Sequence, residues 1–212
     1  MFIKYIFIGL LFCTHLIAEE FYINPYYLDK LQKNSRSYKI IKHYVNFLNT
    51  IKDDDDKSKI EKVNRYINKI IPKYDANNYK NEEYWATPFE FFSNIGGDCE
   101  DYVIAKMYSL ERLGISPKIM YMSAVKEKYA GGDHMVLSLH VDRNSSPIVL
   151  DNLSTRVLPI DKRVDLELVF MFNEYGFYQL ENHKKLREIN RINLPAYKKF
   201  KSRDSENLIL KR

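Results

Sequence analysis

Cysteine is scarce in this sequence, which contains two in 212 residues. Cys13 lies in an apolar N-terminal stretch, so removal of that stretch would leave Cys99 as the only thiol. A framework of disulfides and a zinc site built from several cysteines are therefore both excluded. After residue 18 there is also no run of the roughly 20 apolar residues that a membrane-spanning helix needs. The whole sequence, with 45% hydrophobic and 29% charged residues, has the composition of one globular domain.

The first 18 residues have the pattern of a secretory signal peptide. Lys4 precedes a mostly apolar stretch from Tyr5 to Ile17, and Ala18 stands before Glu19. This pattern predicts export with cleavage after Ala18, and the alternative is an uncleaved N-terminal anchor.

Positive charge is concentrated at the C-terminal end. The net charge is +5, and residues 184–212 contain ten Lys and Arg against three Asp and Glu. We therefore expect a folded domain over residues 19–183 and a solvated basic C-terminal tail over 184–212, with contact to a membrane or an acidic partner as the alternative for the tail. Nucleic-acid binding is not expected, because the chain carries an export signal and no recognisable binding motif.

Hydrophobic periodicity places helices first and strands afterwards. Apolar residues at helical spacing predict helices over 38–52 and 58–74. A third helix is predicted to start at Thr87-Pro88-Phe89-Glu90, a capping box with proline in the first helical position. A fourth is predicted from Cys99 to Gly114. Alternation with a period of two then predicts strands over 118–125, 134–142, 148–152, 169–173 and 177–180. This order predicts an α+β fold with an antiparallel sheet.

Cys99 stands where a glycine-rich loop is predicted to become a helix, in Gly96-Gly97-Asp98-Cys99-Glu100-Asp101-Tyr102. Asp98 is expected to cap the helix, and Asp101 to reach back as the second half of a capping box. The first helical position would then belong to Cys99, where unpaired backbone N–H groups and the helix dipole favour a thiolate. These features predict a nucleophilic thiol.

A thiol nucleophile needs a base, and the base needs a group that orients it. His134 is the preferred base, because it starts a predicted strand directly after Gly131-Gly132. His140 is expected at an edge or on the surface. Asp151 ends an apolar strand, and an antiparallel neighbour would bring it to His134; its alternative role is that of a turn residue, and Asp133 and Asp142 are weaker candidates.

Four motifs of this chain resemble the bacterial transglutaminase-like cysteine proteinases. They are Tyr84-Trp85-Ala86-Thr87-Pro88-Phe89-Glu90, Gly96-Gly97-Asp98-Cys99-Glu100-Asp101-Tyr102, His134-Met135-Val136-Leu137 and Val149-Leu150-Asp151-Asn152-Leu153. The resemblance runs from about Asn64 to Tyr178. It implies a papain- or transglutaminase-like cysteine protease fold over 19–183, with the nucleophile helix packed on the sheet. It also implies that Cys99, His134 and Asp151 are nucleophile, base and orienting acid.

The resemblance further implies a calcium ion held by Asp98 and Glu100, with Asp101 a possible further ligand; helix capping is the alternative role for Asp98. It implies a periplasmic endopeptidase that cuts the N-terminal region of a large surface adhesin and releases cells from a biofilm. An inner-membrane receptor that senses cyclic di-GMP is the implied partner. A transamidase and a non-catalytic binding domain of the same fold are the rival functions. Trp85 is expected either to donate its indole N–H to an oxyanion hole or to form a wall of the cleft.

Overall fold

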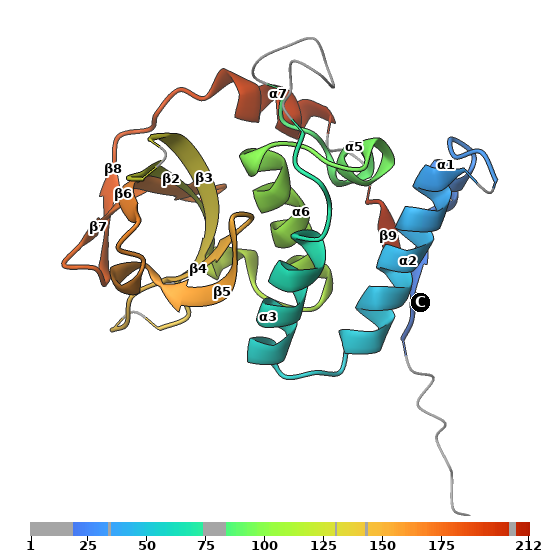
Figure 1. Ribbon diagram of the computed structural model, residues 1–212, viewed down its shortest axis with the longest axis horizontal. Coiled ribbons are helices and arrows are strands. Elements are labelled where there is room, and N and C mark those ends of the chain that lie inside the picture. The colour runs from blue at the N-terminus through green and yellow to red at the C-terminus, as the bar shows by residue number, and fades with distance from the viewer. Residues whose placement is uncertain (1–18, 34, 74–83, 130, 143, 204–206) are drawn as a thin grey trace, which may run out of the picture.

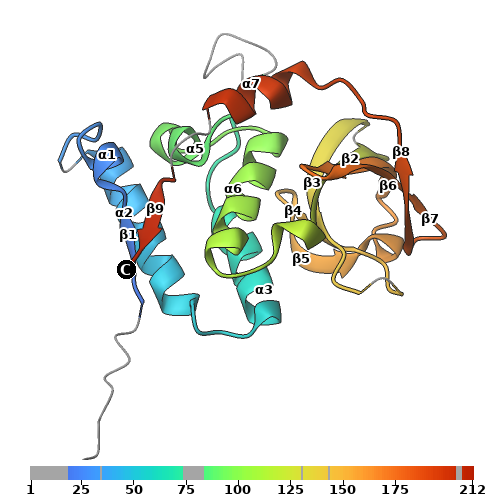
Figure 2. The same ribbon diagram turned by 180° about the vertical axis from the view of Figure 1, so that it is seen from behind.

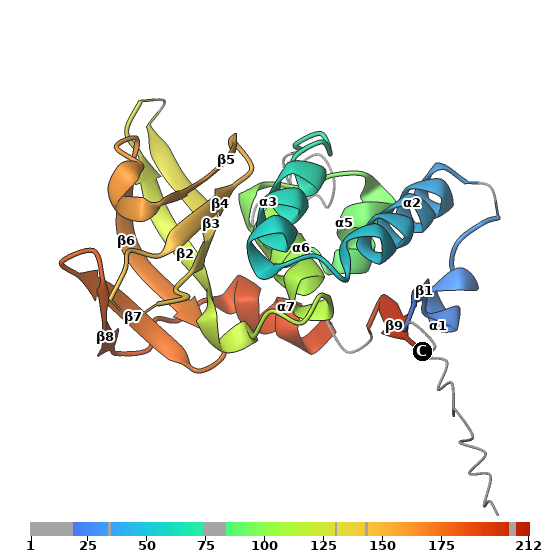
Figure 3. The same cartoon turned by 90° about the horizontal axis from the view of Figure 1, so that it is seen from below.

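The computed structural model describes residues 19–33, 35–73, 84–129, 131–142, 144–203 and 207–212. The predicted signal peptide, residues 1–18, lies outside the described residues and stays a prediction. Figure 1 shows helices gathered on one side of the molecule and a curled sheet on the other, with α6 (Cys99–Arg112) between them. Figure 3, turned by 90°, shows the same division.

The helices are α1 (Pro25–Leu28), α2 (Arg36–Ile51), α3 (Asp56–Ile67), α5 (Pro88–Asn94), α6 (Cys99–Arg112) and α7 (Pro195–Arg203). The periodicity predicted α2, α3, α5 and α6. Helix α3 is shorter than predicted and ends at Ile67. The Asn68 side-chain amide, at the C-cap, donates to the backbone carbonyls of Asp151 (2.7 Å) and Ser154 (2.9 Å). These bonds tie the end of α3 to the strands that follow the site.

The start of α5 confirms the predicted capping box. The Thr87 hydroxyl accepts from the backbone N–H of Glu90 at 3.3 Å, and the Glu90 carboxylate accepts from the backbone N–H of Thr87 at 2.8 Å. Two of the donors that every helix N-terminus leaves unsatisfied are thus paired. Ile95 ends the helix in the left-handed conformation, with φ of 58°, and the chain turns there toward Cys99.

A seven-stranded sheet follows the helices, in the order β5-β4-β3-β2-β6-β7-β8, with antiparallel pairing throughout. The strands are β2 (Met120–Glu127), β3 (Gly132–Leu139), β4 (Ile148–Asp151), β5 (Ser154–Pro159), β6 (Leu166–Asn173), β7 (Gly176–Glu181) and β8 (Lys185–Ile189). The α+β prediction and five of these strands are confirmed. Strands β5 and β8 were not predicted, because most of their residues are polar and the alternation of apolar with polar residues is weak. In the structure their side chains are half-exposed or exposed.

Residues 184–212, expected as a solvated basic tail, contain β8, α7 and a last strand, β9 (Ile209–Lys211), which pairs antiparallel with β1 (Phe21–Ile23). Figure 2 shows α7 lying between the sheet and α5. Phe200 of α7 is buried, and the backbone N–H of Ile209 donates to the Tyr108 hydroxyl of α6 at 2.7 Å. The segment therefore packs on the folded part, and Arg203 of α7 forms an ion pair with Glu90 of α5 at 2.9 Å. The division between a domain over 19–183 and a tail over 184–212 stays a prediction.

Helix α6 is the central element of the core. It packs against α3 and α5 on one side and against β2 and β3 on the other. Its buried side chains include Tyr102, Val103 and Leu110. In the part of the chain that the structure describes, no helix has both the length and the apolar character to cross a membrane.

Candidate active site

Cys99 is the first residue of α6, as predicted, but the expected side-chain cap by Asp98 is not formed. Asp98 occupies the N-cap position, yet its side chain makes no cap hydrogen bond. Asp101 is fully buried, and its Oδ1 accepts from the backbone N–H of Ala86 at 2.6 Å. The predicted cap by the Asp98 side chain is therefore wrong, and Asp101 fastens the segment before α5 to the start of α6.

Gly97 is required by this arrangement. A Cβ atom at Gly97 would lie 2.1 Å from Oδ2 of Asp101, which is far inside van der Waals contact. The loop before the nucleophile thus passes directly over the buried carboxylate.

The thiol of Cys99 is half-buried between Glu100 and strand β3. Its Sγ lies 3.1 Å from Oε2 of Glu100, and the backbone N–H of Met135 donates to the sulfur. Burial raises the pKa of the thiol well above its usual range, and Glu100 raises it further, whereas the Met135 bond lowers it. The sequence predicted an easily formed thiolate from the helix N-terminus alone. Burial and a neighbouring carboxylate, which the helix argument did not include, act in the opposite direction.

His134 and Asp151 form the pair that the sequence predicted. Nε2 of His134 lies 2.9 Å from Oδ1 of Asp151, across the antiparallel strands β3 and β4. The Asp151 side chain is fully buried. Because Met135 follows His134 directly, the thiol meets β3 one residue from the imidazole. The structure therefore assembles the three predicted residues from the start of α6, the first half of β3 and the end of β4.

Arg163 joins this site and was missed by sequence reasoning. Its Nη2 donates to Oδ2 of Asp151 at 2.7 Å. Burial alone would raise the pKa of Asp151, but the hydrogen bonds from His134, the Leu153 backbone N–H and Arg163 lower it to about 2. The acid is thus ionised at neutral pH. An arginine close to an acid, as in Arg163-Val164-Asp165, is common on surfaces, so no sequence pattern pointed to Arg163.

Lys106 was also missed. It lies on α6 seven residues after Cys99, about two helical turns away on the same face. The side chain is 1% exposed, and its ammonium lies 5.9 Å from the centre of the Tyr102 ring. Burial lowers the pKa of Lys106 to about 7, and the charge of Asp151 partly opposes this shift.

His140 and Trp85, two further residues singled out in the sequence, have contacts of their own. His140 comes after the end of β3 and is buried, with Nε2 3.1 Å from the carbonyl oxygen of Ser145. The expectation of an edge or surface residue is therefore wrong, since the following turn folds back over the ring. Trp85 is 6% exposed and packs against Tyr197 and Phe172, with ring centres 5.7 and 6.3 Å apart.

The constellation coincides with a family match. A model of the bacterial transglutaminase-like cysteine proteinases matches residues 35–165, more than half of the chain. The chain belongs to this family. Calcium-bound LapG of Legionella pneumophila is 26% identical, with a TM-score of 0.72, over 84% of this chain and 95% of that one. EGTA-treated LapG gives the same identity and TM-score over 85% and 95%. No curated protein matches the chain. The protein is accordingly a transglutaminase-like cysteine protease, as the sequence predicted.

The acids around the Cys99 thiol carry oxygens of the kind that calcium prefers. No group of three or more His, Cys, Asp or Glu side chains within the described ranges is arranged to hold a metal. Asp98 and Glu100 flank the thiol at the helix start, and paired carboxylates are hard donors that fit calcium, with backbone carbonyls and water completing the shell. Asp101 is turned inward, and one of its oxygens is used by Ala86. Its role as a further ligand stays a prediction.

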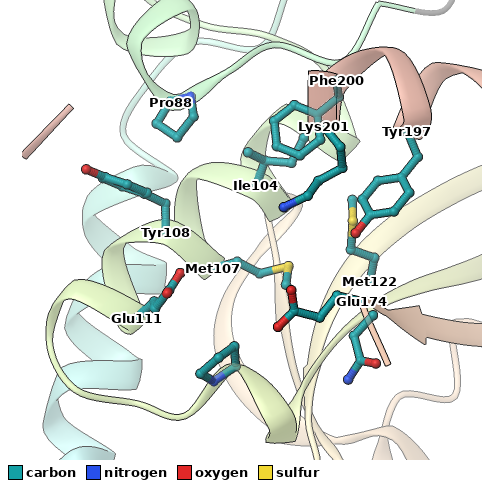
Figure 4. Close-up of a pocket in the computed structure, with 12 residues that line it drawn as sticks. Pro88, Ile104, Met107, Tyr108, Glu111, Met122, Glu174, Tyr197, Phe200 and Lys201 are labelled. Atoms are coloured by element: carbon teal, nitrogen blue, oxygen red, sulfur yellow. The ribbon is translucent and has the colours of Figure 1, made fainter. Parts of the chain in front are cut away.

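A groove with a volume of about 900 Å³ runs beside the His134 and Asp151 side chains of the protease. Three exposed apolar side chains line it: Tyr129, Leu153 and Val164. Figure 4 shows a second, smaller hollow of about 180 Å³, between α6 and α7. Its lining includes Ile104, Met107 and Phe200 but none of the predicted catalytic or metal-binding residues. The larger groove thus borders His134 and Asp151, two of the three predicted catalytic residues, while Cys99 is not among the residues that line it.

Proposed function

We propose that this protease is an exported, calcium-dependent endopeptidase that uses Cys99, His134 and Asp151 as its catalytic triad. The observation that carries the proposal is the 2.9 Å contact between His134 and Asp151, one residue from the point where β3 meets the Cys99 thiol. A thiol, an imidazole and a buried carboxylate in this order are the groups that acyl transfer by a cysteine requires.

The proposed reaction has two steps. His134 takes the thiol proton, and the sulfur lone pair of Cys99 attacks the scissile carbonyl carbon, whose π electrons move to oxygen. Collapse of this intermediate breaks the C–N bond, and the imidazolium returns its proton to the leaving amine. Water, deprotonated by His134, then attacks the thioester and releases the acid and the free thiol. Asp151 orients the ring and stabilises its charge.

The oxyanion of each intermediate needs preorganised donors. The backbone N–H of Cys99, in the first turn of α6, is the proposed first donor. The packing of Trp85 among aromatic side chains favours its role as a wall of the site over that of the second donor.

Calcium is proposed to bind at Asp98 and Glu100. The support is their position on both sides of Cys99 and the likeness to calcium-bound LapG, which extends over 95% of the LapG chain. Bound there, the ion would supply positive charge beside the nucleophile and withdraw the Glu100 carboxylate from it.

The proposed substrate is the N-terminal region of a large surface adhesin, cut in the periplasm to release cells from a biofilm, and the proposed partner is an inner-membrane receptor for cyclic di-GMP. The likeness to LapG supports this assignment. The groove beside His134 would hold the polypeptide, with Leu153 and Val164 contacting its apolar side chains.

The test is cleavage of adhesin N-terminal segments from the same organism by the purified mature protein. We expect discrete products, loss of cleavage with a calcium chelator, and recovery with excess calcium. Asp98→Asn with Glu100→Gln should mimic the chelator, while Glu188→Gln, on the exposed strand β8, should not. Intact segments under every condition would refute the proposal, and incorporation of an added amine into the product would identify a transamidase instead.

A further inference from the structure

Every oxygen of the Asp151 carboxylate is engaged. Oδ1 faces Nε2 of His134 and accepts from the backbone N–H of Leu153, both at 2.9 Å. Oδ2 accepts from Nη2 of Arg163 at 2.7 Å. Because the terminal torsion of an aspartate is broad and roughly two-fold, one bonded oxygen alone leaves the carboxylate plane free to rotate. Partners on both oxygens fix that plane.

Arg163 is itself held in place. Its Nε lies 2.9 and 3.1 Å from the two oxygens of Asp165, and its Nη2 lies 2.5 Å from Oδ2 of the same residue. The backbone carbonyl of Asp165 accepts from the N–H of Lys128 at 2.9 Å, which anchors it beyond the end of β2. Arg163 is 6% exposed. A planar guanidinium clamped along one edge can present the second N–H of Nη2 in only one direction.

We infer that Arg163 is a positioning residue of this protease: clamped by Asp165, it holds the Asp151 carboxylate in the plane that faces His134. The inference rests on the proposed catalytic triad. The series of side chains that begins at the Cys99 nucleophile then runs through His134, Asp151 and Arg163 to Asp165. It also assigns a purpose to a buried arginine that the proposed reaction leaves unused.

The charge of Arg163 also acts on the attraction between Asp151 and His134. This effect distinguishes a positioning role from packing alone. The charged groups that face Asp151 are His134 from β3, Lys106 from α6, and Arg163 with Asp165 behind it. A fixed cation on Oδ2 weakens the attraction between Asp151 and a protonated imidazole. Because His134 must be neutral to take the thiol proton, removing this cation should move the acidic limb of the pH profile of cleavage to higher pH. Loss of packing alone would not move that limb.

The experiment compares Arg163→Gln, Arg163→Lys and Asp165→Asn in the full chain with the matched control Arg187→Gln. Arg187 forms an exposed ion pair with Glu181 on the outer strands. We expect Arg163→Gln to lower kcat about 10- to 100-fold, the usual effect of losing an outer orienting partner, with KM nearly unchanged. Its acidic limb should move to higher pH. Arg163→Lys keeps the charge, so its acidic limb should stay in place while kcat is only partly recovered. Arg187→Gln should match the wild type.

The rate of Cys99 alkylation by iodoacetamide as a function of pH, mapped by mass spectrometry, gives a readout that does not need peptide cleavage. If the wild type cleaves nothing, the proposed function fails, but the alkylation profile of Arg163→Gln still tests the inference. A folded Arg163→Gln with wild-type kcat and wild-type profiles overturns the inference and leaves the proposed triad intact. If Arg163→Gln does not fold, Asp165→Asn decides: unchanged kcat and profiles overturn the inference.

Discussion

Replacing Lys106 with methionine should stabilise the protein at neutral pH. Lys106 is 1% exposed inside α6, and burial lowers its pKa to about 7, from an ordinary value near 10.4. At about 1.4 kcal/mol per pKa unit, this difference sets a ceiling of about 5 kcal/mol on the cost of burying the ammonium. This shift already includes the attraction to Asp151, which opposes the cost of burial, and replacing buried charges by apolar side chains typically stabilises by about 1–4 kcal/mol. Methionine suits the space because it is unbranched and adaptable.

The gain should depend on pH with a definite sign. The folded-state pKa of Lys106 lies below that of the unfolded chain, so between about pH 7 and 10.4 the unfolded chain binds more protons. Stability of the wild type therefore rises with pH through this window. The advantage of Lys106→Met should be largest below pH 7 and shrink toward pH 10.

Urea unfolding followed by circular dichroism at pH 6.5 and pH 9.5 measures both effects. Lys199→Met, at an exposed position of α7, is the matched control and should change stability by less than about 0.5 kcal/mol at either pH. A Lys106→Met variant that is less stable than the wild type at both pH values would refute the reasoning. It would mean that the ammonium contributes more through Asp151 than its burial costs.

Three further substitutions test separate contacts. Thr87→Ala removes half of the α5 capping box and should lower the free energy of unfolding by about 1 kcal/mol in thermal or urea denaturation; an unchanged midpoint would contradict the cap. Gly97→Ala places a Cβ on the Asp101 carboxylate and should cost about 3 kcal/mol together with most of the activity, so a stable, active variant would contradict the close approach. Leu153→Ala removes an apolar wall of the groove and should raise KM about 5-fold with kcat unchanged, whereas the exposed control Val141→Ala should not; an unchanged KM would exclude Leu153 from substrate contact.

Local rules predicted the parts of this molecule that depend on neighbouring residues. The capping box at Thr87 and Glu90 needs only four residues, and the apolar face of α2 needs only a helical period, so both were confirmed. The pairing of His134 with Asp151 followed from two consecutive strands joined by a turn. In each case the contact is short in sequence or is set by a single hairpin.

Contacts between distant segments were not predictable in this way. Strands β1 and β9 have three residues each and exist because the two ends of the described chain meet. Asp101 has the sequence context of a capping residue, but its buried partner, Ala86, is 15 positions away. Arg163 and Lys106 look like surface cations in the sequence. Their roles appear only when the fold brings them to Asp151.

The most direct test of the central claim is to trap the acyl-enzyme. The protein is mixed with a cleaved peptide in calcium, quenched with acid within milliseconds to seconds, and digested for mass spectrometry. The proposed reaction predicts the mass of the N-terminal product on the peptide that contains Cys99, and neither adduct nor cleavage with a folded Cys99→Ala variant. Cleavage by Cys99→Ala at the wild-type rate, or an adduct on a different residue, would contradict the claim that this thiol is the nucleophile.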